Sequence, residues 1–320
     1  MKTIIIFGAQ GRLGFTVTKH FASAGFNVVA VSRSGHVDGL ASSIEHRQAD
    51  ALNEQDVIRA AKGADFIFNG LNPLYTDWRT HALPMAENIM KAAAIEKAVH
   101  LFPGNIYGYG ADMPALLNEQ TPDQPTTEKG SIRLQMETLF RRYAENGAVR
   151  TRIIRAGDFF GGEKTGSWFD LIVVAKLHKN IFQYPGDPTI NHAWAYLPDL
   201  AEAFVSLAGH DQSFGSFECF TFEGHTLTGH QLQSALERLT QRSLKRKTVP
   251  WPVLRLGGIV IKMWAEIAKM SYLWFTPHRL DGTRLSKITG DKKQTPLPLA
   301  LAQSLKDLGY QDLVGKQTAD

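Results

Sequence analysis

Three glycines in the pattern G-x-x-G-x-x-G restrict the possible folds of this chain more than any other feature. They occupy positions 8, 11 and 14, directly after the apolar run Thr3–Phe7 and directly before an amphipathic stretch. Glycines in a strand–turn–helix connection let the backbone approach a pyrophosphate, and the helix N-terminus adds unpaired N–H groups. This context predicts a dinucleotide-binding Rossmann unit. The turn residues expected to contact the dinucleotide are Gly8, Gln10, Gly11, Arg12, Leu13 and Gly14.

Strand-like and helix-like runs alternate through the first half of the chain. This β-α-β-α order predicts a doubly wound parallel sheet of the α/β class. We expect strands at residues 3–7, 27–32, 45–49, 65–69, 98–102 and 150–156, and helices at 12–24, 53–62, 80–96 and 126–146.

The second half is richer in Pro, Trp and Phe, and its elements alternate irregularly. It predicts a smaller, mostly helical lobe over the carboxyl ends of the strands, where open α/β sheets bind ligands. We assign residues 1–160 to the dinucleotide-binding domain and 161–320 to a substrate-binding lobe, with some return of the chain to the sheet. Expected helices are 168–177, 199–208, 229–241, 252–270 and 297–308, and expected strands are 193–197 and 217–222.

Composition narrows the partners and the compartment. The formal net charge is +4, and no stretch interleaves clustered Lys and Arg with aromatic residues, so nucleic acid is not expected. The basic run 245–247 is interpreted as a solvated helix end. A lone cysteine excludes an intrachain disulfide, and the 11 histidines form no H-E-x-x-H motif, so no metal is expected.

No apolar run is long enough and uncharged enough to span a membrane. The aromatic-rich stretch 250–275 is interpreted as lid or core, with a monotopic membrane contact as the less favoured alternative. The sequence shows no signal-peptide pattern. We therefore expect a cytoplasmic protein that binds a small-molecule substrate, with a homodimer as a possible assembly.

The end of the second strand selects the cofactor. NAD-binding sites usually place Asp or Glu there, whereas this chain has Ser32 and Arg33, which suit a 2′-phosphate. NADP(H) is therefore preferred and NAD(H) is possible. Arg12 is expected to approach the same phosphate, and Asp50 to accept from the adenine amino group. The remaining expected cofactor contacts are Asn69, Gly70, Leu71, Pro103 and Arg133.

Three further segments follow the glycine turn in a familiar order. They read NIYG at 105–108, RAGDFFG at 155–161 and AYLPDLA at 195–201. With the turn, they resemble the V-Y-G, R-P-x-N-V-Y-G and Y-V-D-D-L-A segments of the extended or atypical short-chain dehydrogenase/reductases, a group also labelled NAD-dependent epimerase/dehydratase. The resemblance covers about residues 2–308 and implies a Rossmann fold with a dinucleotide cofactor.

The resemblance fails at the proton relay. The family uses Tyr-x-x-x-Lys on a helix and a Ser or Thr after the fifth strand. Here Lys129 stands at the Tyr position, Arg133 at the Lys position and Pro103 at the Ser/Thr position. Two cations one turn apart would repel, so a Lys129 that loses its proton could serve as acid or base. The candidate catalytic residues are Asn105, Tyr107, Lys129, Arg133 and Asp158.

Three functions remain open from the sequence. The first is an NADP(H)-dependent oxidoreductase that acts on a small carbonyl or alcohol. The second is a catalytically silent NADP(H)-binding sensor or interaction protein, which the missing relay favours. The third is a sugar-nucleotide epimerase or dehydratase, which normally needs the tyrosine base. The loop at residues 72–78 carries aromatic side chains that could line a substrate site.

Overall fold

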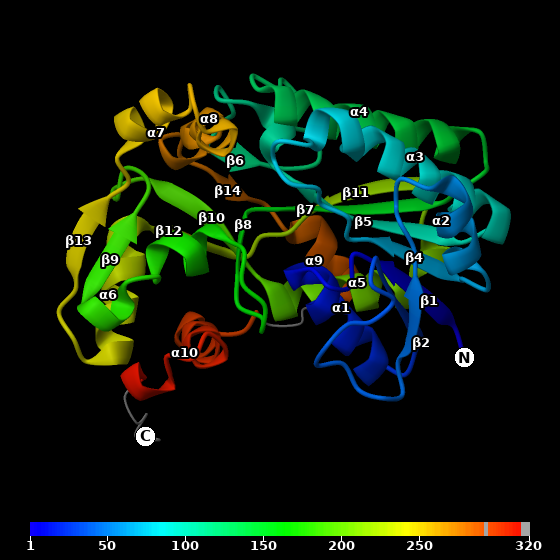
Figure 1. The fold of residues 1–320 in the computed structure, drawn as a ribbon, viewed down its shortest axis with the longest axis horizontal. Coiled ribbons are helices and arrows are strands. Elements are labelled where there is room, and N and C mark those ends of the chain that lie inside the picture. The colour runs from blue at the N-terminus through cyan, green and yellow to red at the C-terminus, as the bar shows by residue number, and fades with distance from the viewer. Residues whose placement is uncertain (291–293, 315–320) are drawn as a thin grey trace.

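A seven-stranded parallel sheet forms the larger part of the molecule (Figure 1). The structure is a computed structural model that describes residues 1–290 and 294–314. The strands of this sheet are β1 (Thr3–Phe7), β2 (Asn27–Ser32), β3 (Glu45–Gln48), β4 (Phe66–Asn69), β5 (Val99–Asn105), β7 (Thr151–Ala156) and β11 (Phe217–Thr221). Their order is β11-β7-β5-β4-β1-β2-β3, and every adjacent pair is parallel. This arrangement confirms the predicted doubly wound sheet.

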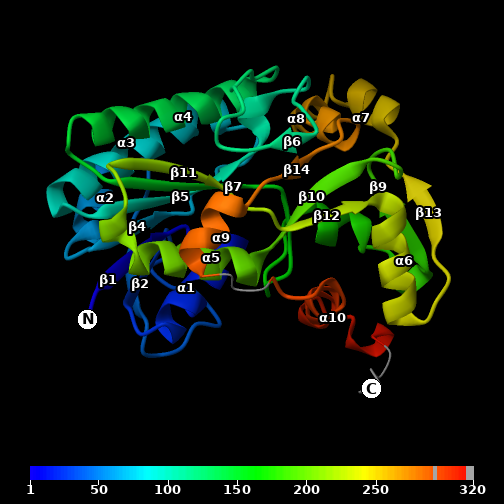
Figure 2. The same cartoon turned by 180° about the vertical axis from the view of Figure 1, so that it is seen from behind.

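Helices cover both faces of the sheet, which explains why its central strands, such as β1, are mostly apolar. Ile4 and Ile6 of β1 pack into one core, and Ile5 and Phe7 pack into the other, because successive side chains of a strand point to opposite faces. One face carries α2 (Glu54–Ala61), α3 (Trp78–Glu96) and α4 (Glu128–Glu145). The other carries α1 (Arg12–Ser23), α5 (Leu197–Gly209) and α9 (Thr283–Thr289), as Figure 2 shows from behind.

A smaller lobe stands beside the carboxyl ends of the strands. Its sheets have the orders β12-β10-β8 and β13-β9, and a short pair β14-β6 joins it to the larger part. Its strands are β6 (Leu116–Leu117), β8 (Asp158–Phe160), β9 (Ile181–Tyr184), β10 (Asn191–Tyr196), β12 (His225–Thr228), β13 (Lys245–Thr248) and β14 (Arg279–Leu280). Its helices are α6 (Gly229–Thr240), α7 (Trp251–Gly257), α8 (Lys262–Lys269) and α10 (Leu297–Asp307).

Three expectations for the second half were wrong. The predicted helix 252–270 is two helices, α7 and α8, separated by residues 258–261. The basic run 245–247 is the exposed strand β13 rather than a helix end. The predicted helix 168–177 contains only a π-helical turn, Phe169–Val173, followed by a separate 3₁₀ turn at Leu177–Lys179.

The chain returns from the smaller lobe to the large sheet. Strand β11 pairs with β7, and α5 packs against α1, so residues beyond 160 contribute to the dinucleotide-binding half. A domain boundary near residue 160 stays a prediction. Within residues 1–290 and 294–314, no helix is both long and apolar enough to cross a bilayer.

Candidate functional site

The three positions of the turn require glycine for different structural reasons. Gly8 has φ +79°, and a Cβ there would lie 2.6 Å from the Gly70 carbonyl oxygen. A Cβ on Gly14 would overlap the Gly8 carbonyl oxygen, so both positions require glycine for the fold. Gly11 differs, because its φ is −74° and a Cβ would meet only the Gly8 carbonyl oxygen, at 3.2 Å. Apart from this one close contact and the two adjacent residues, no atom of the described chain lies within 4 Å of that Cβ position, so a pyrophosphate could approach closely there.

No side chain caps the N-terminus of helix α1. Gly11 is the N-cap residue, so no side chain caps the first N–H groups, and the first turn holds no acidic residue. Uncapped N–H groups and the positive end of the helix dipole suit an anion. The open glycine and the uncapped helix together fit the phosphates of a dinucleotide.

Arg12 is engaged within the protein. Its guanidinium lies 2.7 Å from the Asp170 carboxylate and donates to the Gly161 carbonyl at 2.7 and 3.0 Å. Burial lowers the pKa of Arg12, while Asp170 opposes this shift. These contacts tie α1 to the second half of the chain. The predicted contact of Arg12 with a 2′-phosphate would require them to be exchanged.

At the end of β2, one basic side chain is free to meet a ligand. The Ser32 and Ser34 hydroxyls both donate to the His36 carbonyl, at 3.0 and 2.9 Å. Arg33 is exposed, and its guanidinium makes no contact with another residue of the described chain. Asp50 caps its own loop, where its carboxylate accepts from the Leu52 N–H at 3.0 Å.

Asn69 closes β4 beside the glycine turn. It is only 1% exposed, and its Nδ2 has no hydrogen-bond partner among the described residues. A buried donor without a partner is costly unless something else accepts from it. Gly70 follows and donates to the Phe7 carbonyl at 3.0 Å, which holds this segment, with Leu71, against β1. Asn69 thus keeps a donor that no described residue satisfies.

Lys129 and Arg133 lie on the buried face of α4. The helix begins after Thr127, whose hydroxyl accepts from the Gly130 N–H at 3.2 Å. Lys129 is 3% exposed and Arg133 is 8% exposed. The Lys129 ammonium forms an ion pair with Glu266 of α8 and lies 4.8 Å from the centre of the Tyr75 ring. Lys129 therefore has a carboxylate partner in addition to the Arg133 cation one turn away.

Glu266 is the anion that the sequence analysis missed. It also contacts Lys269, at 2.5 Å. Burial raises the pKa of Glu266, but the hydrogen bonds from Lys129 and Lys269 outweigh it and lower the pKa below its usual value. Glu266 therefore faces Lys129 as a carboxylate. The two residues are 137 positions apart, so no local spacing could reveal the pair.

Aromatic rings and an amide enclose Arg133. Its guanidinium carbon lies 4.6 Å from the Trp78 ring centre and 5.1 Å from that of Phe102. Its Nη2 is 3.5 Å from the Asn72 side-chain oxygen, and its Nε has no partner among the described residues. Burial lowers its pKa, but a guanidinium keeps its proton in proteins. Arg133 can therefore donate to a ligand and cannot act as a base.

Two tyrosines form a buried pair beside Lys129. The hydroxyl oxygens of Tyr75 and Tyr107 are 2.9 Å apart. Burial raises the pKa of both side chains, so both phenols are protonated at neutral pH. The Asn105 side-chain oxygen accepts from the Tyr107 N–H at 3.0 Å and so forms the turn that positions this ring. Pro103 also lies in β5. The pairing of β5 with β4 ends at Leu101, two residues before Pro103.

A histidine of the neighbouring strand β10 contacts the carboxylate of Asp158. This carboxylate lies 2.8 Å from Nε2 of His192, and the His192 ring stacks on Trp274 with centres 4.2 Å apart. The parallel pairing of β8 with β10 brings Asp158 close to His192. The sequence analysis missed His192, because this contact depends on a strand pair that the pattern did not show.

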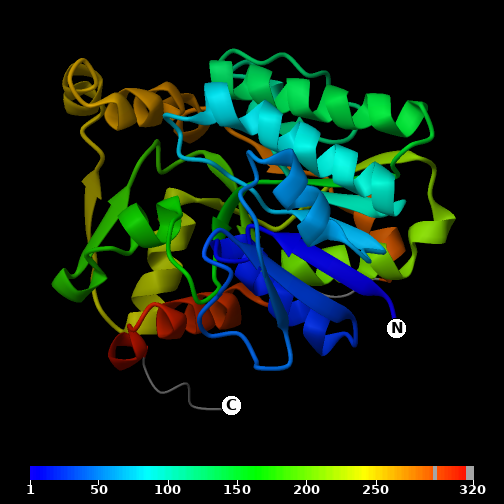
Figure 3. The same cartoon turned by 45° about the vertical axis from the view of Figure 1, so that its right-hand side comes forward.

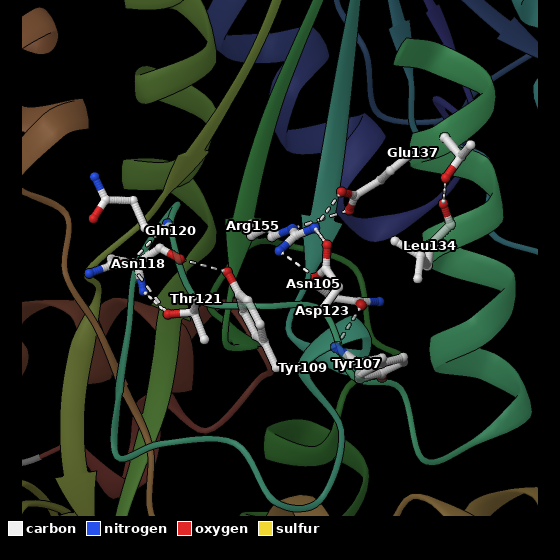
Figure 4. A network of polar contacts seen from close by, with 11 residues as sticks. Asn105, Tyr107, Tyr109, Asn118, Gln120, Thr121, Asp123, Leu134, Glu137 and Arg155 are labelled. Carbon is white, nitrogen blue, oxygen red and sulfur yellow. Dashed lines mark hydrogen bonds and ion pairs between the residues drawn. The ribbon is translucent and has the colours of Figure 1, made fainter. Parts of the chain in front are cut away.

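A separate polar network fixes α4 against the sheet (Figure 4). Arg155 of β7 contacts the Glu137 carboxylate at 2.6 Å and the Asp123 carboxylate at 2.9 Å, and its guanidinium lies 4.8 Å from the Tyr109 ring centre. Since Glu137 is on α4, this network sets the position of the helix that carries Lys129 and Arg133.

Comparison with known proteins places this geometry in a family. The sequence matches the family model described as NAD dependent epimerase/dehydratase over residues 4–220. The chain belongs to this family. No curated protein matches the sequence.

Solved structures of the epimerase type share the whole fold. UDP-glucose 4-epimerase from Brucella ovis, in complex with NAD, superposes with a TM-score of 0.77 at 14% identity, covering 97% of this chain and 99% of that chain. UDP-glucuronic acid 4-epimerase from Bacillus cereus gives 0.76 at 14% identity, with 97% and 100% covered. UDP-glucose 4-epimerase from Bifidobacterium longum gives 0.75 at 15% identity, with 97% and 98% covered. At these identities the likeness shows the fold alone.

Within the epimerase/dehydratase family, this chain has the expected sheet and glycine turn. The positions that the resemblance assigns to the family's Tyr and Lys hold Lys129 and Arg133. The glycine turn, the first strands and α4 stand as the resemblance implied. Lys129 and Arg133 occupy the buried face of α4. Glu266, Tyr75 and His192 are additional polar groups near this centre, and each comes from a segment outside the motifs that resemble the family's.

Proposed function

We propose that the chain is an NAD(P)(H)-dependent enzyme that transfers hydride at an alcohol or carbonyl carbon of a small-molecule substrate. The observation that carries this proposal is the buried Lys129–Glu266 pair at the tyrosine position of the family relay. A charged lysine is rarely buried unless an opposite charge pairs with it or it has a role in the site's chemistry. Here it lies beside the Tyr75–Tyr107 pair, on a helix fixed by the Arg155 network.

The cofactor contacts follow from the groups that are free. The open face of Gly11 and the uncapped start of α1 would hold the pyrophosphate, and Arg133 would donate to the nicotinamide ribose. Arg33 would hold a 2′-phosphate, so we propose a preference for NADP(H). When bound, the nicotinamide supplies or accepts the hydride.

Lys129 would act on the substrate oxygen. Its ammonium stabilises the negative charge that develops on that oxygen during carbonyl reduction and can then give it a proton. Glu266 keeps the ammonium in position between substrate turnovers. The protonated phenols of Tyr75 and Tyr107 would be further hydrogen-bond donors at this site.

A sugar-nucleotide epimerase or dehydratase is the second candidate. The family match and the full-length fold similarity to UDP-sugar epimerases favour it at least as well as the reductase. Such an enzyme returns the hydride to its substrate, so it leaves no net change in the cofactor. A reductase oxidises one NAD(P)H per product.

The test combines two substrate panels with two readouts. The purified protein is incubated with NADPH, NADH or NAD⁺ and with panels of aldehydes, ketones and UDP- or dTDP-sugars. Cofactor absorbance reports net oxidation, and chromatography reports new isomers or loss of water. Net NADPH oxidation supports the reductase, and a new sugar isomer without it supports the epimerase.

A catalytically silent cofactor sensor is the remaining alternative. It is favoured by the engagement of Lys129 with Glu266 and by Pro103 at the Ser/Thr position. Tight cofactor binding in calorimetry together with no turnover in either panel would support the sensor and contradict both enzymatic proposals.

A further inference from the structure

The α7–α8 hairpin presents an apolar tip to solvent. Val253 and Leu256 lie three residues apart on α7, and Ile259 and Val260 follow in the connection to α8. Leu256 is 70% exposed, Ile259 84% and Val260 85%. These values are the highest for large apolar side chains in the described chain after Met1. Isolated exposed apolar residues are ordinary, but a contiguous cluster marks a contact surface.

The local geometry holds this tip in place. A Cβ on Gly257 would overlap the Trp264 ring, and a Cβ on Gly258 would lie 2.9 Å from the Ala265 backbone. The two glycines therefore let α7 and α8 close tightly on each other, which pushes the residues between them outward. Figure 3 shows the hairpin at the edge of the molecule, where β13 leads into it. The tip is a projection rather than a groove.

The sequence that leads into and through the tip carries charge of one sign. Between Glu237 and Glu266 the sequence has seven Lys or Arg residues and no Asp or Glu. Arg255 and Lys262 flank the apolar tip and are exposed, as are the three basic residues of β13, Lys245, Arg246 and Lys247. An apolar projection with a basic surround matches the interface of a bilayer that contains anionic lipids.

A second copy of the chain fits this surface less well. A two-fold symmetric contact would place the same patch of both copies together, so the basic side chains around the tips would repel. Anionic headgroups, in contrast, attract the basic residues while the aliphatic tip enters the acyl boundary.

We propose that the α7–α8 hairpin, with Leu256, Ile259 and Val260 at its tip, docks this protein onto anionic membrane surfaces. The contact is peripheral and involves no membrane span. Each aliphatic side chain that enters the bilayer contributes binding free energy in proportion to its buried area. Each nearby Lys or Arg adds an electrostatic attraction to the lipid headgroups, which salt weakens.

Co-sedimentation of the full chain with lipid vesicles tests the proposal. We expect binding to vesicles of phosphatidylcholine with about one third phosphatidylglycerol, little binding to pure phosphatidylcholine, and weaker binding as salt rises. The variant Ile259→Ser/Val260→Ser should bind at least about tenfold more weakly. The variant Arg255→Gln/Lys262→Gln should lose a similar factor with anionic vesicles only.

Control variants change exposed residues of the same types elsewhere on the protein. Ile95→Ser/Leu299→Ser and Lys287→Gln/Lys306→Gln should bind as the wild type does, and circular dichroism should show the same fold for every variant. Equal binding to neutral and anionic vesicles, or equal binding by the tip variant, would overturn the proposal. Self-association in sedimentation equilibrium that only the tip variant abolishes, without vesicle binding, would overturn it in favour of a second copy.

Discussion

At the residue scale, the glycine turn separates two kinds of requirement. Gly8 and Gly14 have no room for a side chain within the protein itself, whereas Gly11 has room on its outer side. The motif predicts one glycine for the tight turn, one for close approach of the pyrophosphate and one for helix–strand packing. The backbone shows that Gly8 and Gly14 are needed for the fold, which leaves Gly11 as the glycine expected to face the pyrophosphate.

This difference predicts opposite outcomes for two substitutions. Gly11→Val should abolish dinucleotide binding in calorimetry and leave the melting temperature close to that of the wild type. Gly14→Ala should destabilise the protein by about 1–3 kcal/mol, because its Cβ overlaps the Gly8 carbonyl oxygen. Unchanged cofactor affinity in Gly11→Val would refute the assignment of the turn.

Arg33 carries the prediction of cofactor choice. Its guanidinium is exposed and free of protein contacts in the described chain. A charge-assisted contact with a phosphate is worth about 1.5–3 kcal/mol, so Arg33→Ala should weaken NADPH binding about tenfold to a hundredfold. NADH serves as the internal control and should bind equally to both proteins. An equal loss for both cofactors would mean that Arg33 does not contact the 2′-phosphate.

At the element scale, α8 is connected to the centre of the site through one ion pair. Glu266 on α8 faces Lys129 on α4, and both side chains are largely withdrawn from water. Removing Glu266 leaves the buried Lys129 charge without its carboxylate partner, whereas Glu266 without Lys129 still has Lys269. The relative position of these two helices therefore depends on a pair of residues that neither helix's own pattern explains.

Glu266→Gln should lower the free energy of unfolding by about 1–2 kcal/mol, a value reduced for its partial exposure. Lys129→Met/Glu266→Gln should recover part of that loss, which a double-mutant cycle in urea measures. The lowered pKa of Glu266 also predicts the direction in which this stabilisation changes with pH. Its stabilisation is present above the ordinary Glu pKa and is lost as pH falls below it, so wild type and Glu266→Gln should converge in acid. A constant difference down to acid pH would contradict the pair.

The elements also show what the sequence could and could not predict. The strands of the first half lie within a few residues of their predicted bounds, because most of them, unlike the polar β3, are apolar runs between turn signals. Strand β13 escaped prediction, since its Lys245, Arg246 and Lys247 show no alternation and its partner β9 is about 60 residues away. Lys129 and Arg133 follow from the resemblance to the family's Tyr-x-x-x-Lys helix. Glu266 and His192 could not be found, because each contact joins residues that are far apart in the sequence.

At the scale of the whole molecule, two buried histidines link folding to pH. Burial lowers the pKa of His100 and of His278 to about 3. In the unfolded chain a histidine titrates near about 6.5, so below that pH the unfolded state takes up protons that the native state does not. Stability should therefore fall as pH decreases from 6.5, by about 1.4 kcal/mol per histidine one unit lower.

Urea unfolding at pH 7.5 and at pH 5.5 measures this loss, which should be about 3 kcal/mol for the two histidines together. His100→Phe should show roughly half of the wild-type loss, whatever its stability at pH 7.5. His36→Gln changes an exposed histidine and should keep the full loss. A loss that is the same in all three proteins would exclude His100 as a source.

The central claim is that Lys129 serves hydride transfer at a bound nicotinamide cofactor. The most direct measurement compares wild type with Lys129→Met, once a substrate is found, for turnover and for NADPH affinity. General acid–base catalysis contributes about 10²–10⁴-fold, so kcat should fall by at least about a hundredfold while the calorimetric Kd for NADPH stays unchanged. Full turnover by Lys129→Met, or a parallel loss of cofactor affinity, would contradict this account.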